Sequence, residues 1–119
     1  MKRKVLIVDD EQVCATFMSL ALEAEGFDVK TAYKAADALR IGQEMQPDVL
    51  ITDWMLKDDQ DGIDIAKILM NSFPAMRVIF ITGMALDLVE TKAAGVPGHS
   101  VIVKPVDLDE VIKLLGPAA

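Results

Sequence analysis

The sequence predicts an α/β domain in which helices pack on both faces of a parallel β-sheet, and three observations support this prediction. Short apolar runs alternate along the chain with segments of helical periodicity, which is the pattern of repeated β-α-β units. Four of the runs end abruptly in polar residues, as strands do when their carboxyl ends reach solvent. Hydrophobic residues make up 52% of the 119-residue chain but aromatic residues only 5%, which indicates an aliphatic core.

The first half of the chain contains three predicted strands and two predicted helices. Runs 5–8 and 49–51 are apolar throughout, which is typical of strands buried on both faces, whereas 27–32 is a weaker strand suited to a sheet edge. The first helix begins at Glu11 and stops at Gly26, and its apolar face recurs at helical spacing: Val13, Phe17, Leu20 and Ala24. The second helix ends before Pro47, and its face is formed by Ala35, Ala38, Leu39 and Gly42.

The second half repeats the alternation. Strands are predicted at 78–81 and 101–103. Three helices are predicted, one ended by Pro74 and one closed by Gly95. Their apolar faces are Ile65, Ile68 and Leu69, then Leu86, Val89 and Ala93, then Leu108, Val111, Ile112 and Leu115. Five strands alternating with five helices require right-handed crossovers between parallel strands.

Composition excludes several classes of function. The formal net charge of −7 argues against direct binding of nucleic acid, which needs a basic face, and favours a basic or cationic partner. The single cysteine, Cys14, cannot form an internal disulfide. Residues 1–4 lead into only four apolar residues, so no signal peptide is predicted, and no run is long enough for membrane insertion. We therefore expect a soluble cytoplasmic protein.

Polar residues follow four predicted strands: Asp9 and Asp10, Asp53, Thr82, and Lys104. Singly, each has an ordinary explanation, since an aspartate can cap a helix, a threonine favours strands, and a lysine is usually solvated. A parallel sheet, however, brings these ends to one edge. Clustered carboxylates repel and raise one another's pKa unless a cation neutralises them, and Mg²⁺ suits such oxygen ligands together with a phosphate. Asp53 is then the candidate nucleophile, with Lys104 and Thr82 contacting phosphoryl oxygens.

This combination of residues resembles the response-regulator receiver domain over essentially the whole chain, which would make 1–119 a single receiver domain. The resemblance implies the flavodoxin-like fold with strand order 2-1-3-4-5. It also implies that Asp53 accepts a phosphoryl group from a sensor histidine kinase or histidine phosphotransferase. Asp10, Asp53 and the Met55 carbonyl would ligate Mg²⁺ directly, Asp9 largely through water, and Lys104–Pro105 would be a cis peptide. The phosphorylated domain would act on a downstream protein or on an output domain absent from this chain.

Several positions depart from the usual receiver pattern. Lys57 replaces a common proline, and Gly62 is displaced by one residue. Val101 stands where receivers commonly carry tyrosine or phenylalanine, so the usual coupling of the threonine to a rotating aromatic ring cannot operate as such. We expect a smaller packing change at Val101. Two methionines beyond the strand ends, Met55 and Met84, either shield the acyl phosphate from water or simply pack within their loops.

The sequence leaves two alternative functions. A haloacid-dehalogenase-like phosphohydrolase would carry a D-x-D nucleophile motif on the first strand, where this chain has adjacent aspartates. A degenerate receiver would bind partners without phosphorylation. His99 is interpreted as a loop residue, Cys14 as a packing residue or an unreactive thiol, and Trp54 as either a reporter of phosphorylation or a structural plug. The acidic stretch 58–62 lacks the ligands of a calcium loop, and no nucleotide-binding glycine motif occurs.

Overall fold

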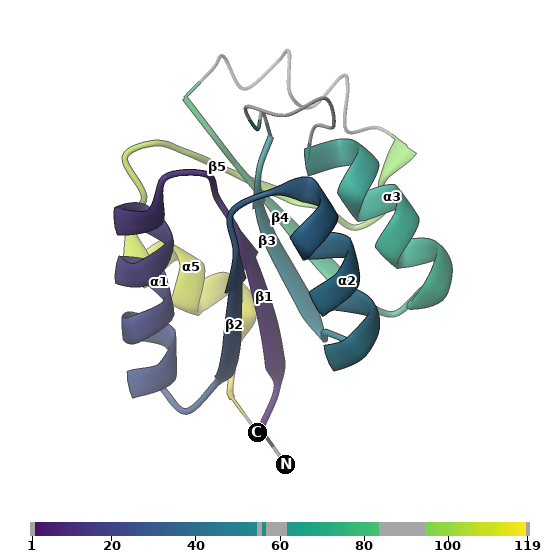
Figure 1. Ribbon diagram of the computed structural model, residues 1–119. Coiled ribbons are helices and arrows are strands. Elements are labelled where there is room, and N and C mark those ends of the chain that lie inside the picture. Colours follow the sequence, from purple (N-terminus) through teal and green to yellow (C-terminus); the bar gives the residue numbers. More distant parts are fainter. Residues whose placement is uncertain (1, 55, 57–61, 84–94, 119) are drawn as a thin grey trace.

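The computed structural model describes residues 2–54, 56, 62–83 and 95–118, and it contains a five-stranded parallel sheet of order β2-β1-β3-β4-β5 (Figure 1). The strands are β1 (Lys4–Val8), β2 (Asp28–Ala32), β3 (Val49–Asp53), β4 (Arg77–Thr82) and β5 (Ser100–Val103). The described helices are α1 (Gln12–Ala24), α2 (Ala35–Met45), α3 (Gly62–Ser72) and α5 (Leu108–Leu115). The predicted fold class and strand order are confirmed. The helix predicted at Leu86, Val89 and Ala93 lies outside the described residues.

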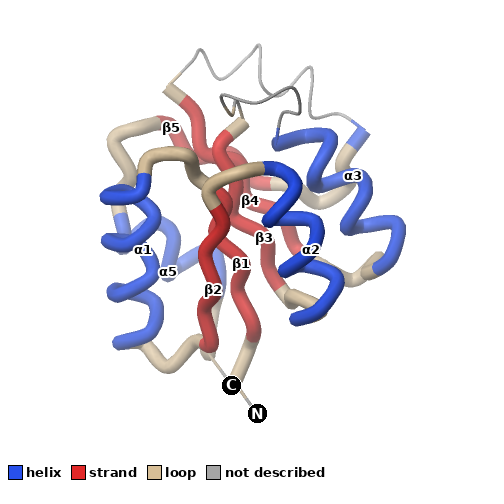
Figure 2. Tube along the Cα trace, in the orientation of Figure 1, coloured by secondary structure: helices blue, strands red, loops and turns tan. Residues whose placement is uncertain are grey.

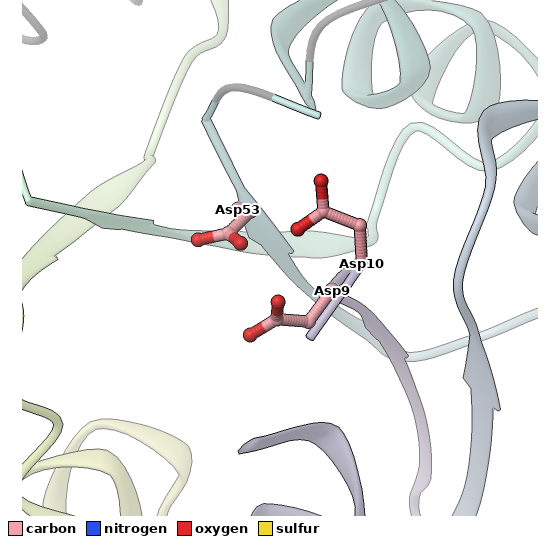
Figure 3. Close-up of side chains that lie close together, drawn as sticks. All are labelled: Asp9, Asp10 and Asp53. Carbon is pink, nitrogen blue, oxygen red and sulfur yellow. The ribbon is translucent and has the colours of Figure 1, made fainter. Parts of the chain in front are cut away.

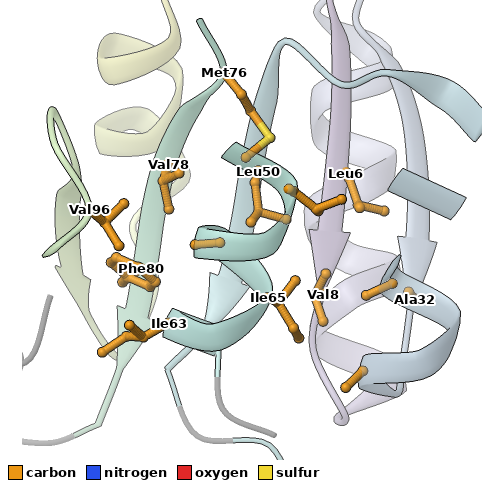
Figure 4. Packing of buried hydrophobic residues seen from close by; sticks show 14 of the residues in the cluster. Leu6, Val8, Ala32, Leu50, Ile63, Ile65, Met76, Val78, Phe80 and Val96 are labelled. Carbon is orange, nitrogen blue, oxygen red and sulfur yellow. The ribbon is translucent and has the colours of Figure 1, made fainter. Parts of the chain in front are cut away.

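Helices cover both faces of the sheet, with α1 and α5 on one face and α2 and α3 on the other (Figures 1 and 2). Because side chains alternate along a strand, each face has its own core. Leu50 of β3 packs toward α2 and α3, together with Phe80 and Ile65 (Figure 4). The next residue, Ile51, belongs to the core beneath α1 and α5. All of β3 is buried, which explains its continuous apolar run.

The predicted apolar face of α1 is wrong, although the helix itself is confirmed. Val13, Phe17 and Leu20 are 85%, 62% and 63% exposed. The side of α1 that packs on the sheet consists instead of Ala15, Met18 and Leu22. The helix ends as predicted before Gly26, whose φ of +100° favours glycine. Three large hydrophobic side chains therefore remain on the surface of α1.

Two arginines fix the last turn of α5 to the rest of the domain. The guanidinium of Arg3, just before β1, donates to the carbonyl oxygen of Leu115, and that of Arg77 in β4 donates to Leu114. Cations at a helix carboxyl end also interact favourably with the helix dipole. The main-chain N–H of Arg3 donates to the Ala118 oxygen at 2.7 Å, so the two ends of the described chain lie side by side.

Candidate functional site

The register of the sheet brings the polar strand ends to one edge, at the top of Figure 1. Val8 of β1 pairs with Thr52 of β3, and Asp53 pairs with Ile81 of β4. Thr82 pairs in turn with Val103 of β5. Asp9 and Asp10 directly follow β1, and Lys104 directly follows β5. The polar residues predicted at the ends of these strands therefore lie close together in space.

Three carboxylates gather at the ends of β1 and β3 (Figure 3). Asp9, Asp10 and Asp53 each offer an oxygen, and these atoms all lie within 4.8 Å of one another. Asp9 Oδ1 accepts a 2.9 Å hydrogen bond from the N–H of Glu11, immediately before α1. Its buried Oδ2 has no hydrogen-bond partner among the described residues. Grouped carboxylate oxygens, one of them unsatisfied, fit a hard cation such as Mg²⁺.

The ammonium group of Lys104 lies against the other side of Asp53. Lys104 Nζ is 3.1 Å from Asp53 Oδ1 and 3.3 Å from Oδ2. It is also 3.9 Å from Glu11 Oε1. The Lys104–Pro105 peptide is cis, as the resemblance implied, and the main-chain N–H of Lys104 donates to the Thr82 oxygen at 2.6 Å. Asp53 is thus flanked by a cation on one side and carboxylates on the other.

This environment shifts the pKa values of three groups. Burial, then the neighbouring Asp9 carboxylate, raises the pKa of Asp53 to about 7, against the opposing effect of Lys104. Burial lowers the pKa of Lys104, but the hydrogen bond and charge of Asp53 outweigh it, so that the net shift is upward. Burial, then the neighbouring Asp9 carboxylate, raises the pKa of the Cys14 thiol to about 11. Cys14 is therefore a protonated thiol at neutral pH.

Without divalent cations, the folded protein should lose stability as Asp53 ionises. Its folded pKa of about 7 exceeds the ordinary value of 3.8, so between these values the folded state binds more protons, and the free energy of unfolding falls as pH rises. Asp53→Asn removes the buried charge and should raise the free energy of unfolding at about pH 8 on the order of 1–3 kcal/mol. Urea denaturation checks this. The gain should shrink at about pH 5, and an equal gain at both pH values would contradict the prediction.

The remaining predicted residues are placed only in part. Thr82 is buried at the end of β4, at the same edge as Asp53. Val101 is half-buried, pairs with Phe80 and packs against the core beneath α2 and α3. The smaller packing change expected at Val101 on phosphorylation stays a prediction. His99 lies in the loop before β5, with Nδ1 2.8 Å from the Val96 oxygen, and Trp54 is buried. Met55, Lys57 and Met84 lie outside the described residues.

The sequence interpretation missed two neighbours of the site. Glu11 forms an ion pair with Lys104, although 93 positions separate them in the chain. Cys14 packs against the core beneath α1 and α5, as predicted, but its thiol also interacts with the Asp9 carboxylate. A signal did exist, because residues in the first turn after a strand lie above that strand's end. No pattern in the sequence, however, distinguishes these two side chains from their solvated neighbours.

Comparisons with known proteins agree on one family. The model of the response regulator receiver domain matches residues 5–116. The chain is 36% identical over 110 residues to "Probable transcriptional regulatory protein TcrX" of Mycobacterium tuberculosis, covering 91% of this chain and 46% of that protein. It is 32% identical over 112 residues to an NtrX-like response regulator of Rickettsia bellii, covering 93% and 23%. The chain thus spans less than half the length of these relatives.

Solved structures agree on the fold. The chemotaxis protein CheY4 of Vibrio cholerae superimposes with a TM-score of 0.88 at 24% identity, covering 97% of each chain. A response regulator receiver protein of Sinorhizobium medicae superimposes with a TM-score of 0.85 at 25% identity, covering 94% of this chain and 90% of the other. Among the described helices, none has the length and apolar character needed to cross a membrane.

Proposed function

The chain belongs to the response regulator receiver domain family, and from this premise we propose that Asp53 accepts a phosphoryl group from a phosphohistidine. The observation that carries the proposal is the position of its carboxylate. It is only 6% exposed, and it lies between the Lys104 ammonium group and the two aspartates that follow β1. The donor would be a sensor histidine kinase or a histidine phosphotransferase. Residues 1–119 would act as one receiver domain in the cytoplasm, as a signalling module rather than a conventional enzyme.

Mg²⁺ is the proposed cofactor. Asp10 and Asp53 would supply oxygen ligands directly and Asp9 largely through water, and the Met55 carbonyl is the further ligand expected from the family resemblance. When bound, the ion neutralises the clustered carboxylates and the charge of the phosphoryl oxygens. The buried Oδ2 of Asp9 supports this assignment, because it has no hydrogen-bond partner within the described part of the chain and such an oxygen is costly to bury.

The residues of this chain have separate roles in the transfer. A carboxylate oxygen of Asp53 forms a bond to phosphorus while the phosphorus–nitrogen bond of the phosphohistidine breaks, and the imidazole leaves with the bonding electrons. Lys104 Nζ, 3.1 Å from Asp53, is placed to pair with a phosphoryl oxygen. The Thr82 hydroxyl, at the neighbouring strand end, would donate a hydrogen bond to another. The product is an aspartyl phosphate that changes the surface presented to a downstream protein or output domain.

The exposed side of α1 is the proposed docking surface for the donor. Val13, Phe17 and Leu20 form a row that begins one turn after Asp10, so a partner lying on this row can reach Asp53 with a histidine. Exposed apolar rows beside a reactive site are typical of protein interfaces. The donor must offer an apolar surface to this row and a phosphohistidine to Asp53. An amphipathic helix with its phosphohistidine on the apolar side meets both needs, because the histidine and the apolar face then contact the domain together.

The proposal is tested with acetyl phosphate, Mg²⁺ and the purified domain. Mass spectrometry should detect one added phosphoryl group, labile in alkali, that is absent from Asp53→Asn and absent when Mg²⁺ is chelated. A labile phosphate that persists in Asp53→Asn would place the acceptor elsewhere. A clean negative for the wild type would instead favour the degenerate-receiver alternative. The haloacid-dehalogenase-like alternative has lost its support, because the family match is to receivers.

A further inference from the structure

Thr52, the residue before Asp53, carries a buried hydroxyl directly after the three apolar residues of β3. Its side chain is fully buried, and Oγ1 donates a 2.9 Å hydrogen bond to the main-chain oxygen of Asp53. Alternation along β3 places Thr52 on the face covered by α2 and α3, opposite the Asp53 carboxylate. Thr52 therefore contacts the main-chain carbonyl of Asp53, from the face of the sheet opposite the Asp53 carboxylate.

Gly62, the first residue of α3, packs against the main-chain oxygen of Asp53. A Cβ atom on Gly62 would lie 2.1 Å from the Asp53 oxygen and 2.9 Å from Thr52 Oγ1, so only glycine allows this approach. The N–H of Gly62 also donates to the Trp54 oxygen at 2.7 Å. Helix α3 thus packs directly on the peptide that follows the phosphoacceptor.

The peptide between Asp53 and Trp54 is held at both ends. Its N–H, on Trp54, donates to the Ile81 oxygen of β4 at 2.9 Å. Its oxygen accepts the Thr52 hydroxyl on the other side. A peptide plane with both groups bonded cannot rotate without breaking one of these bonds, so it helps to fix the direction in which the Asp53 Cα–Cβ bond leaves the strand.

We propose that Thr52 is a positioning residue for phosphoryl transfer. Its hydroxyl fixes the main-chain carbonyl of Asp53, against which Gly62 packs, and this holds the Asp53 side-chain carboxylate toward Lys104. This inference rests on the proposed function of Asp53. A nucleophile displaced by about 1 Å loses on the order of 100-fold in rate, so loosening one of two anchors should slow transfer measurably without abolishing it. A merely structural hydroxyl would affect folding alone.

Three variants separate the hydroxyl from the bulk of the side chain. Thr52→Val keeps the volume and removes the hydroxyl, Thr52→Ser keeps the hydroxyl and removes a methyl group, and Thr52→Ala removes both. With acetyl phosphate at saturating Mg²⁺, we expect phosphorylation of the valine and alanine variants to be about 3- to 10-fold slower. The serine variant should stay within about twofold of wild type. Stability from urea denaturation should follow the lost volume instead, with alanine the least stable.

The valine and serine variants should rank in opposite orders for rate and for stability, whereas alanine should rank low in both, and this reversal is the signature of positioning. Rates that follow side-chain volume, or a valine variant as fast as wild type, would overturn the proposal. The ¹³C shift of the Asp53 carbonyl gives a readout without any phosphodonor, and it should move in the valine and alanine variants but not in the serine variant. If the wild type takes up no phosphoryl group, the proposed function fails, whereas this NMR comparison still decides whether the hydroxyl holds the carbonyl.

Discussion

Replacement of Phe17 by aspartate should slow phosphoryl transfer from a phosphohistidine-bearing protein by about 30- to 100-fold, the usual loss when a central aromatic contact is removed from an interface. The ring is 62% exposed on α1 and makes up the middle of the row Val13, Phe17 and Leu20. A charge there would be buried against the apolar face of the donor at a further cost. The transfer rate is measured with a labelled donor protein at concentrations below saturation.

Two controls make this result specific to docking. The rate with acetyl phosphate should be unchanged in Phe17→Asp, because a small donor does not need the α1 surface. Ile68→Asp is the matched variant, since Ile68 is a 43% exposed hydrophobic residue on α3, on the other face of the sheet. It should transfer at the wild-type rate with both donors. Equal losses with both donors in Phe17→Asp would mean that the substitution damages the site rather than docking.

The fold could be predicted from the sequence because its physical signals are strong and local. A strand buried on both faces is expected to be mainly apolar, as in β3, where Val49, Leu50 and Ile51 precede the polar end of the strand. The orientation of α1 could not be predicted in the same way. Both sides of this helix carry apolar residues, and the smaller Ala15 faces the sheet while the larger Phe17 faces solvent. Periodicity shows that a helix has an apolar row, but it does not show which row is buried when there are two.

The site could be predicted to the level of the strand ends and no further. Asp9, Asp10, Asp53 and Lys104 converge because parallel strands in register end at one edge, a consequence of topology alone. The pairing of Glu11 with Lys104 and the bond from Thr52 to the Asp53 oxygen depend on side-chain rotamers and on the path of the chain after each strand. Those details arise from tertiary packing, and no spacing rule in the sequence encodes them.

Replacement of Lys104 by methionine should slow phosphorylation by acetyl phosphate about 100-fold, the usual effect of removing one donor from developing phosphoryl charge. Methionine keeps the length of the side chain and removes the ammonium group that lies 3.1 Å from Asp53 Oδ1. The rate constant is measured at saturating Mg²⁺ and saturating phosphodonor, so that the loss reports on the transfer step rather than on binding. Lys113→Met, on an exposed lysine of α5, is the matched control and should leave the rate unchanged.

The same variant also separates two roles of Lys104. In the free protein its charge opposes the burial and the Asp9 interactions that raise the pKa of Asp53, so Lys104→Met should raise this pKa further. If Lys104 acted only by keeping Asp53 ionised, the loss of rate would shrink as the buffer is made more alkaline, because Asp53 then ionises without the help of Lys104. A loss that persists in alkaline buffer shows that the ammonium group acts on the phosphoryl oxygens. Full recovery of the rate in alkaline buffer would instead mean that Lys104 serves only to keep Asp53 ionised.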